Sequence, residues 1–214
     1  IYTLSLHDAL PISSASYRVR IALNLKGLAY DSVPVSLLDN AQRAPEYLSK
    51  NPQGLVPALL DGEQLLTQSL AICEYLEETY PQPALLPNDA IGRARVRALA
   101  LSIACDIHPL NNLRVLRRLE AQFAADQAGK DAWYQHWIQS GFEAFEQQIQ
   151  STHGQYCFGD TVTLADLALV PQVYNARRFN CDLSAYPTML AIEQRCLALD
   201  AFARATPEAV QAQS

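Results

Sequence analysis

The stretch Asn-Pro-Gln-Gly-Leu-Val-Pro-Ala-Leu-Leu-Asp-Gly-Glu-Gln-Leu-Leu-Thr-Gln-Ser, from Asn51 to Ser69, decides the fold of the N-terminal half. Pro57 cannot donate a hydrogen bond to a sheet, so it favours the start of a short strand over Ala58 to Leu60. A cis bond before Pro57 would leave the N–H and C=O of Val56 able to pair with an extended ligand backbone. Asp61-Gly62 then predicts a tight hairpin turn and a returning strand.

The same stretch ends where a helix is predicted to begin. Apolar residues follow Ser69 at helical spacing as far as Tyr80, so Ser69 is expected to be the N-cap. Free N–H groups and the positive end of the helix dipole attract carboxylates to such a terminus, which makes Gln68 and Ser69 candidates for holding one. An ordinary hairpin followed by a capped helix explains the same residues equally well from chemistry alone.

The composition bounds the class of protein. Half of the 214 residues are hydrophobic, which is enough for one large or two small packed domains. The sequence has no apolar run long enough to span a bilayer and no signal-peptide pattern. Its five cysteines are widely spaced, mostly among apolar residues, which favours reduced core thiols over disulfides or a metal site. We therefore expect a soluble cytoplasmic protein that binds neither a metal nor a membrane.

The charged residues narrow the range of partners. A net charge of -6 argues against non-specific binding of nucleic acid. Thirteen of the sixteen basic residues are arginines, which are favoured where a carboxylate must be held in a planar, bidentate way. For any single arginine a solvated helix face is the better interpretation. The arginines that cluster on predicted helices are Arg93, Arg95, Arg97, Arg114, Arg117, Arg118, Arg177 and Arg178.

The periodicity predicts two domains in order along the chain. Up to residue 81 the expected elements alternate between helices and strands, with a helix from Ser13 to Leu25 and a strand from Tyr30 to Leu37. This pattern is typical of a compact α/β domain. A proline-rich linker over 82–88 follows, and residues 89–214 have helical period throughout, which predicts an all-α domain.

Two features of the second domain carry specific expectations. The segment from Ile91 to Ala125 predicts one long helix that is kinked at Pro109. Thr163, with Asp166 three residues later, predicts an N-cap of the capping-box type at the start of a very apolar helix. Although a threonine and an aspartate could form part of an active site, we expect this pair to be structural.

Residues 1–12 do not fit the α/β pattern. They show neither clean alternation nor a helix cap, and Pro11 would damage a paired strand. From Tyr2 onward they resemble one reading frame of a common sequencing adapter, joined to a gene at Ser13. We therefore hypothesise that residues 1–12 are foreign and that the natural first strand is missing.

Five short segments carry a family resemblance. They are Ser-Ser-Ala-Ser-Tyr-Arg-Val-Arg-Ile-Ala-Leu-Asn-Leu-Lys-Gly from Ser13, Asn-Pro-Gln-Gly-Leu-Val-Pro from Asn51, Gln-Ser-Leu-Ala-Ile from Gln68, His-Pro-Leu-Asn-Asn-Leu from His108 and Asn-Ala-Arg-Arg-Phe from Asn175. Together they resemble zeta-class glutathione transferases, in particular the bacterial maleylacetoacetate isomerases. The resemblance extends from Ser13 to about Leu199, and the serine-rich helix start is its most class-specific part.

The resemblance implies a thioredoxin-like glutathione-binding domain, a helical-bundle second domain and a homodimer. By position, it implies that Ser13 and Ser14 hydrogen-bond the sulfur of glutathione and that Val56 pairs with its cysteinyl backbone. The remaining implied contacts are Gln68 and Ser69 with the γ-glutamyl carboxylate, Gln42, His108 and Asn112 on the glutathione side of the active site, and Arg178 with a small anionic substrate. The family often has cysteine where this chain has Ala15, and usually a strand that ends in arginine where this chain has Pro11-Ile12.

The implied activity is glutathione-dependent cis–trans isomerisation of a small dicarboxylic enone such as maleylacetoacetate. A thiol near a helix N-terminus and beside hydroxyl donors has a stabilised thiolate, which can add reversibly to the double bond. Isomerisation of maleylpyruvate and displacement of halide from an α-halo acid need the same groups and stay open. So does a non-catalytic glutathione-binding module, because a fold does not fix a function. The joint presence of Ser13, Ser14 and the arginines favours the enzyme.

Overall fold

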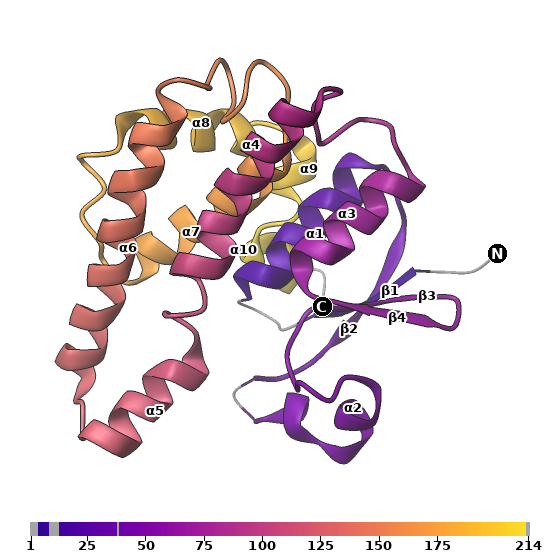
Figure 1. Cartoon of the computed structure of the whole chain (residues 1–214). Coiled ribbons are helices and arrows are strands. Elements are labelled where there is room, and N and C mark those ends of the chain that lie inside the picture. The colour runs from indigo at the N-terminus through magenta and orange to yellow at the C-terminus, as the bar shows by residue number, and fades with distance from the viewer. Residues whose placement is uncertain (1–3, 9–12, 38, 213–214) are drawn as a thin grey trace. The chain divides into compact units, whose positions relative to one another are not determined.

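The structure is a computed structural model that describes residues 4–8, 13–37 and 39–212 (Figure 1). The chain forms two compact units. The first contains the residues up to Ala84 together with those from Leu197 onward, and the second is Leu85–Cys196. The division between Ala84 and Leu85 falls inside the expected linker, whereas the assignment of the last residues to the first unit differs from the expectation that 89–214 form one domain.

The first unit is built on a four-stranded sheet with the order β2-β1-β3-β4. Strand β1 runs parallel to β2 and antiparallel to β3, and β3 and β4 form a hairpin, so the predicted thioredoxin-like sheet is confirmed. Gly62 has a φ of 58° in the hairpin turn, as predicted from Asp61-Gly62. The elements of this unit are β1 (Leu4–Asp8), α1 (Ser14–Leu25), β2 (Tyr30–Pro34), the 3-10 helix η1 (Ala41–Arg43), α2 (Pro45–Lys50), β3 (Ala58–Asp61), β4 (Gln64–Thr67), α3 (Ser69–Thr79), α9 (Asp200–Ala203) and α10 (Pro207–Gln211).

Strand β1 corrects the expectation that residues 1–12 contain no strand. It lies in the middle of the sheet, with Leu4 and Leu6 in the core. His7 is also buried and meets the ring of Tyr47 on α2 edge-on at 6.0 Å, while the adjacent Asp8 faces α1. Because a central strand is covered on both faces, it needs no alternation of apolar and polar residues. Pro11 lies outside the described residues, and the foreign origin of residues 1–12 stays a proposal.

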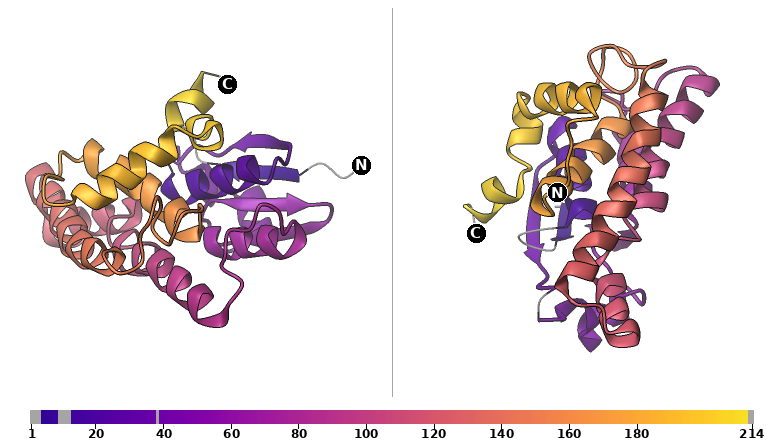
Figure 2. Two further views of the ribbon diagram at one scale, coloured as in Figure 1. Left: turned by 90° about the horizontal axis from the view of Figure 1, so that it is seen from above. Right: turned by 90° about the vertical axis from the view of Figure 1, so that its left-hand side faces the viewer.

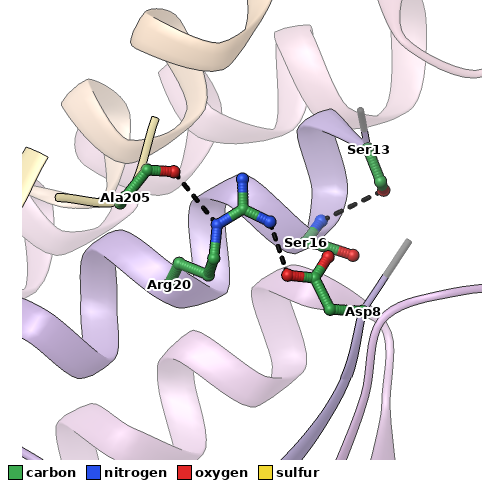
Figure 3. Close-up of polar contacts among 5 residues, drawn as sticks. All are labelled: Asp8, Ser13, Ser16, Arg20 and Ala205. Carbon is green, nitrogen blue, oxygen red and sulfur yellow. Dashed lines mark hydrogen bonds and ion pairs between the residues drawn. The ribbon is translucent and has the colours of Figure 1, made fainter. Parts of the chain in front are cut away.

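Contacts with α1 explain why the C-terminal residues belong to the first unit. The guanidinium of Arg20 is fully buried and donates to the Ala205 carbonyl at 3.0 Å and to the Asp8 carboxylate at 2.6 Å (Figure 3). The Asn24 amide donates to the Ala201 carbonyl at 2.9 Å. Helix α9 contacts α1, and the yellow C-terminal segment that contains it can be followed in Figure 2. These long-range hydrogen bonds have no local sequence signal.

The second unit is helical, as predicted, but the helix expected from Ile91 to Ala125 is wrong. Helix α4 ends at Leu101 and continues as a π-helix to Ile107, and a turn around Pro109 separates it from α5. Proline lacks the N–H that helix continuation requires, so the chain breaks here rather than bending. No helix in the described part of the chain is long and apolar enough to span a membrane. The elements are α4 (Ala90–Leu101), the π-helix η2 (Ser102–Ile107), α5 (Leu113–Phe123), α6 (Gln127–Ile149), α7 (Leu164–Arg178) and α8 (Pro187–Leu197).

Helix α7 is the centre of this unit, and its start confirms the predicted N-cap. Thr163 caps α7, and the buried Asp166 carboxylate accepts from the Thr163 N–H at 2.8 Å and from its hydroxyl at 3.0 Å. The same carboxylate accepts from the Cys157 N–H at 2.9 Å. Asp166 therefore joins the helix start to the preceding loop.

We expect Thr163→Ala to destabilise the protein by about 0.5 to 2 kcal/mol, the usual cost of a lost cap. This corresponds to a melting temperature lower by a few degrees. Thr163→Ser keeps the hydroxyl and should melt close to the unaltered protein. Calorimetry measures both, and a catalytic defect in Thr163→Ala without a stability defect would contradict a structural role.

The burial of His7 makes the docking of β1 testable through pH. Burial, with a smaller contribution from the charge of Lys50, lowers the pKa of His7 below its ordinary value of 6.5. Below pH 6.5 the unfolded chain takes up a proton at this site that the folded chain does not, so stability is complete above that pH and is lost as the pH falls toward the lowered pKa.

We expect the drop in urea midpoint between about pH 7.5 and about pH 5.5 to be smaller in His7→Phe than in the unaltered protein. Replacing the exposed His153 by asparagine controls for the loss of one histidine and should leave the drop unchanged. An equal drop in His7→Phe would mean that β1 is not docked as described.

Candidate functional site

Three chain segments meet at one end of the sheet, where β1 and β4 end and β3 begins. His7 pairs with Ala58, and Ala58 pairs with Thr67, so these residues form one row across the sheet. At that end of the sheet, β1 finishes and the chain leads to α1. Strand β3 begins there shortly after Val56, and β4 finishes there just before Gln68. The topology therefore places the start of α1, the Val56 backbone and the start of α3 around one end of the first unit.

The contacts between α1 and α3 show that the two helices run in the same direction. The Arg18 guanidinium donates to the Ser69 hydroxyl oxygen at 3.3 Å, and the Cys73 thiol lies 4.0 Å from the Arg18 carbonyl oxygen. Further along, the Lys26 ammonium donates to Glu77 at 2.6 Å. A later residue of α1 thus contacts a later residue of α3, so the two helices are parallel. Their N-termini therefore lie at the same end of the first unit. The positive ends of two helix dipoles therefore meet there.

The start of α3 corrects the prediction that Ser69 is its N-cap. The helix begins at Ser69, and Gln68 is the N-cap residue, without a side-chain hydrogen bond to the helix. The Ser69 hydroxyl oxygen accepts from Arg18 instead of turning back to a helix N–H. The first N–H groups of α3 consequently have no side-chain cap among the described residues, and they are the donors that an anion needs.

Gln68 holds an unusual backbone conformation. Its φ of 69° lies in a region that non-glycine residues seldom adopt and that is most often found at functional sites. The side chain is exposed, and its amide donates to the Gln53 side-chain oxygen at 2.9 Å. This bond connects the start of α3 to the loop that leads to Val56.

Asn51 and Tyr47 shape that loop, and our sequence reasoning missed both. The Asn51 amide donates to the Leu55 carbonyl at 2.7 Å, and the Tyr47 hydroxyl donates to the same oxygen at 2.6 Å. The Asn51 side-chain oxygen also accepts from the Gln53 N–H at 3.2 Å, which is an Asx-turn. The Asn-Pro pair at Asn51 is a turn signal from which this role could have been inferred.

Val56 offers a free backbone edge. The Val56-Pro57 bond is cis. Val56 is half-buried, and its N–H and C=O make no hydrogen bond with any residue that the structure describes. A buried or half-buried backbone pair of this kind is a suitable partner for an extended peptide.

Gln42 lies behind the loop, on η1. Its side chain is buried, and its amide oxygen has no partner among the described residues. Its carbonyl oxygen would lie 2.8 Å from a Cβ at Gly54, where φ is 59°, so only glycine lets the two backbones approach this closely. Contact of Gln42 with a ligand stays a prediction.

Ser13 and Ser14 stand at the start of α1. Ser13 is the N-cap, and its hydroxyl oxygen accepts from the Ser16 N–H at 3.2 Å (Figure 3). The hydroxyl hydrogen of Ser13 can still be donated to a ligand, because a hydroxyl both accepts and donates. Ser14 is the first helical residue and is buried. Two hydroxyls at the positive end of a helix can stabilise an anion such as a thiolate.

The remaining predicted residues belong to the second unit. His108 follows η2, and its N–H donates to the Ile103 carbonyl at 2.9 Å. Asn112 is the N-cap of α5, where its side-chain oxygen accepts from the Arg114 N–H at 3.1 Å. The two share one turn after a π-helix, an element frequent at functional sites.

Arg178 is exposed in the last turn of α7, and its guanidinium lies 5.9 Å from the centre of the Phe179 ring. The neighbouring Arg177 is different, because both of its terminal nitrogens bind the Glu193 carboxylate. Of the two adjacent arginines, Arg178 is therefore the one that can hold a substrate carboxylate in a bidentate way.

The protein's own buried thiols are poor nucleophiles. Burial raises the pKa of Cys73 to about 12 and that of Cys181 to about 11. Burial likewise raises the pKa of Cys157 and Cys196. These four buried cysteines therefore do not supply a reactive thiolate, and the described residues contain no cluster of potential metal ligands.

Comparisons with known proteins agree with this architecture. The family model of the glutathione S-transferase N-terminal domain matches residues 9–84, and that of the C-terminal domain matches residues 116–203. Among curated relatives, a maleylacetoacetate isomerase of Rhizobium meliloti is 56% identical over 198 residues, which are 92% of each chain.

Two solved structures have a TM-score of 0.93 with this chain. One is the holo structure of a maleyl pyruvate isomerase, described as a bacterial zeta-class glutathione S-transferase, with 51% identity over 96% of this chain and 97% of that one. The other is a maleylacetoacetate isomerase from Methylobacterium extorquens with bound malonate and glutathione, with 41% identity and the same coverage.

Proposed function

This chain belongs to the zeta class of the glutathione transferase family, and on that premise we propose that it is a glutathione-dependent cis–trans isomerase of maleylacetoacetate. The observation that carries the proposal is the meeting of three groups at one end of the first unit: two parallel helix N-termini and the free backbone of Val56. Together they match the chemistry of a peptide that carries a carboxylate and a thiol.

The residues present fit glutathione. Its γ-glutamyl carboxylate needs several donors, and no side chain in the described part of the chain caps the N–H groups at the start of α3. Its cysteinyl backbone needs one donor and one acceptor in extended geometry, and Val56 offers both. We propose that Gln68 and Ser69 hold the carboxylate, that Val56 pairs with the peptide, and that Gln42, whose buried amide oxygen has no partner among the described residues, lines the glutathione side of the site.

When bound, glutathione supplies a thiolate that can add reversibly to a conjugated double bond and so permit rotation about it. The role proposed for Ser13 and Ser14 is to donate hydrogen bonds to the anionic sulfur. The α1 dipole favours the same charged form and lowers the pKa of the thiol. Neither serine acts as a nucleophile.

The proposed roles in the second unit concern the acidic substrate and the tripeptide. Arg178 would bind a substrate carboxylate, since its guanidinium is exposed and not committed to Glu193. His108 would stabilise negative charge that develops on the substrate carbonyl oxygen. Asn112 keeps its amide N–H groups for glutathione, because only its oxygen is used in capping α5.

Maleylpyruvate is the second candidate substrate, because a similar protein of known structure is a maleyl pyruvate isomerase. Both substrates are small cis-enone diacids and require the same thiolate and the same anion-binding groups. Halide displacement and a non-catalytic role, which the sequence left open, are not favoured by these relatives.

Two further proposals concern the setting of the enzyme. We propose that it acts in the cytoplasm, where glutathione is abundant and the five free cysteines stay reduced. We also propose a homodimer, which the exposed apolar side chains of Ile91 and Leu101 on α4 support. Sedimentation equilibrium measures the mass, and a monomer at micromolar concentration would reject the dimer.

We expect the purified chain to isomerise maleylacetone, an analogue of maleylacetoacetate, only when glutathione is present. Ser13→Ala and Ser14→Ala should each raise the pKa of bound glutathione, measured from thiolate absorbance, because each removes a donor to the sulfur. Isomerisation without glutathione, or an unchanged thiol pKa in both variants, would contradict the mechanism. Comparing kcat/KM for maleylacetone and maleylpyruvate separates the two substrates.

The origin of residues 1–12 bears on the rate, because β1 leads into α1 and fixes where Ser13 lies. A misplacement of about 1 Å can cost on the order of a hundred-fold in rate. If these residues are foreign, the chain should bind glutathione but isomerise slowly, and a replacement strand that ends in arginine should restore turnover. Full isomerase activity of the unaltered sequence would contradict the prediction that residues 1–12 impair catalysis.

We expect Ser69→Ala to weaken glutathione binding by about ten-fold or more, since a hydrogen bond to a charged group contributes about 1.5 to 3 kcal/mol. Turnover at saturating glutathione should change much less. Calorimetric titration gives the dissociation constant, and an unchanged value would reject Ser69 as a carboxylate ligand.

A further inference from the structure

We propose that Arg18 is a positioning residue for the carboxylate at the start of α3. Its buried guanidinium orients the Ser69 hydroxyl toward the ligand and adds positive charge beneath the helix N-terminus. This inference deepens the proposed function and rests on it.

The position of Arg18 makes this role possible. Its side chain leaves α1 in its second turn and is 1% exposed, so its charge acts inside the unit rather than in water. One terminal nitrogen donates to the Ser69 hydroxyl oxygen at 3.3 Å across 51 positions of sequence. Charges act over longer distances in such an environment than at a solvated surface.

The direction of this hydrogen bond fixes what the Ser69 hydroxyl can do. An arginine has donors only, so the serine oxygen must be the acceptor. The single hydroxyl hydrogen of Ser69 then has to point to a different acceptor, away from Arg18. A carboxylate at the start of α3 is such an acceptor, and it would find this hydrogen already oriented.

The start of α3 also lacks a side-chain cap among the described residues. A serine at a helix start commonly accepts from a helix N–H and thereby caps the helix. Here the serine oxygen is engaged with Arg18, and Gln68 makes no side-chain cap. The N–H groups of α3 stay available for the ligand.

The charge of Arg18 also acts on α3 itself. Burial raises the pKa of Cys73 to about 12, and the charge of Arg18 is the largest influence that opposes this rise. Cys73 lies four positions after Ser69, so this positive charge acts inside α3, close to its N-terminus. It adds to the helix dipole, which has the same sign there.

Arg20 provides a matched control. It is also fully buried on α1, but it lies on the other side of the helix and is bound by Asp8 and the Ala205 carbonyl. Replacing it should cost stability, as for any buried arginine, without any effect specific to a carboxylate at α3.

The experiment measures preference for the carboxylate rather than binding alone. Calorimetry gives dissociation constants for glutathione and for γ-aminobutyryl-cysteinylglycine, which lacks only the γ-glutamyl carboxylate. The ratio of the two constants is compared among the unaltered protein, Arg18→Met, Arg18→Lys, Arg20→Lys and Ser69→Ala. A general loss of structure weakens both ligands alike and leaves the ratio unchanged.

We expect the unaltered protein to prefer glutathione by about ten-fold or more. Arg18→Met should reduce the ratio several-fold, toward that of Ser69→Ala, and the double variant should show little further reduction. The ratio for Arg18→Lys should lie between these values, because lysine keeps the positive charge but cannot place it in the same position as the guanidinium. Arg20→Lys should leave the ratio unchanged while lowering the melting temperature.

An unchanged ratio in Arg18→Met would show that Arg18 is only structural. If that variant does not fold, an equal ratio in Arg18→Lys and Arg20→Lys overturns the proposal in the same way. Binding of both ligands with no preference in the unaltered protein would reject the carboxylate assignment while leaving glutathione binding intact. No binding of glutathione at all would reject the proposed function, and the role of Arg18 with it.

Discussion

Two guanidinium groups buried on α1 constrain the arrangement of the first unit. A buried charge is costly unless it is hydrogen-bonded, so each arginine requires a partner from a distant segment. Arg18 and Arg20 are two positions apart, which is roughly 200° around a helix, and they therefore face opposite sides. Arg18 binds the start of α3, whereas Arg20 binds the end of β1 and the C-terminal residues at Ala205.

This constraint bears directly on function. Because α1 and α3 are joined at Arg18 and again at Lys26, their axes run the same way and their N-termini lie at one end. Two positive helix ends side by side disfavour each other, but they suit a ligand with an anion at each end. A peptide with a carboxylate and a thiolate meets that requirement, with the Val56 backbone between them. The proposed isomerase therefore uses backbone dipoles for most of its anion binding and leaves the exposed Arg178 for the substrate.

Strand β1 lies within residues 1–12, for which we propose a foreign origin, and it contributes a partner to Arg20. Asp8 supplies the carboxylate that Arg20 needs, yet it belongs to residues that resemble an adapter rather than a gene. The Ala205 carbonyl is the hydrogen-bond partner of Arg20 that lies outside residues 1–12 in the described part of the chain. The strand itself forms because its apolar residues reach the core, whatever their origin.

The sequence alone determined the features that depend on neighbouring residues. Examples are the hairpin at Asp61-Gly62, the cap at Thr163 and the class of the fold, because turn residues, caps and periodicity act within a few positions. Only the tertiary structure decided that Gln68 rather than Ser69 occupies the N-cap position of α3, without capping it, and that Arg18 binds the Ser69 hydroxyl. Two arginines in an apolar helix with no nearby acid were a signal that could have been read. Their partners could not be, because hydrogen bonds that join residues 51 or 185 positions apart leave no local pattern in the chain.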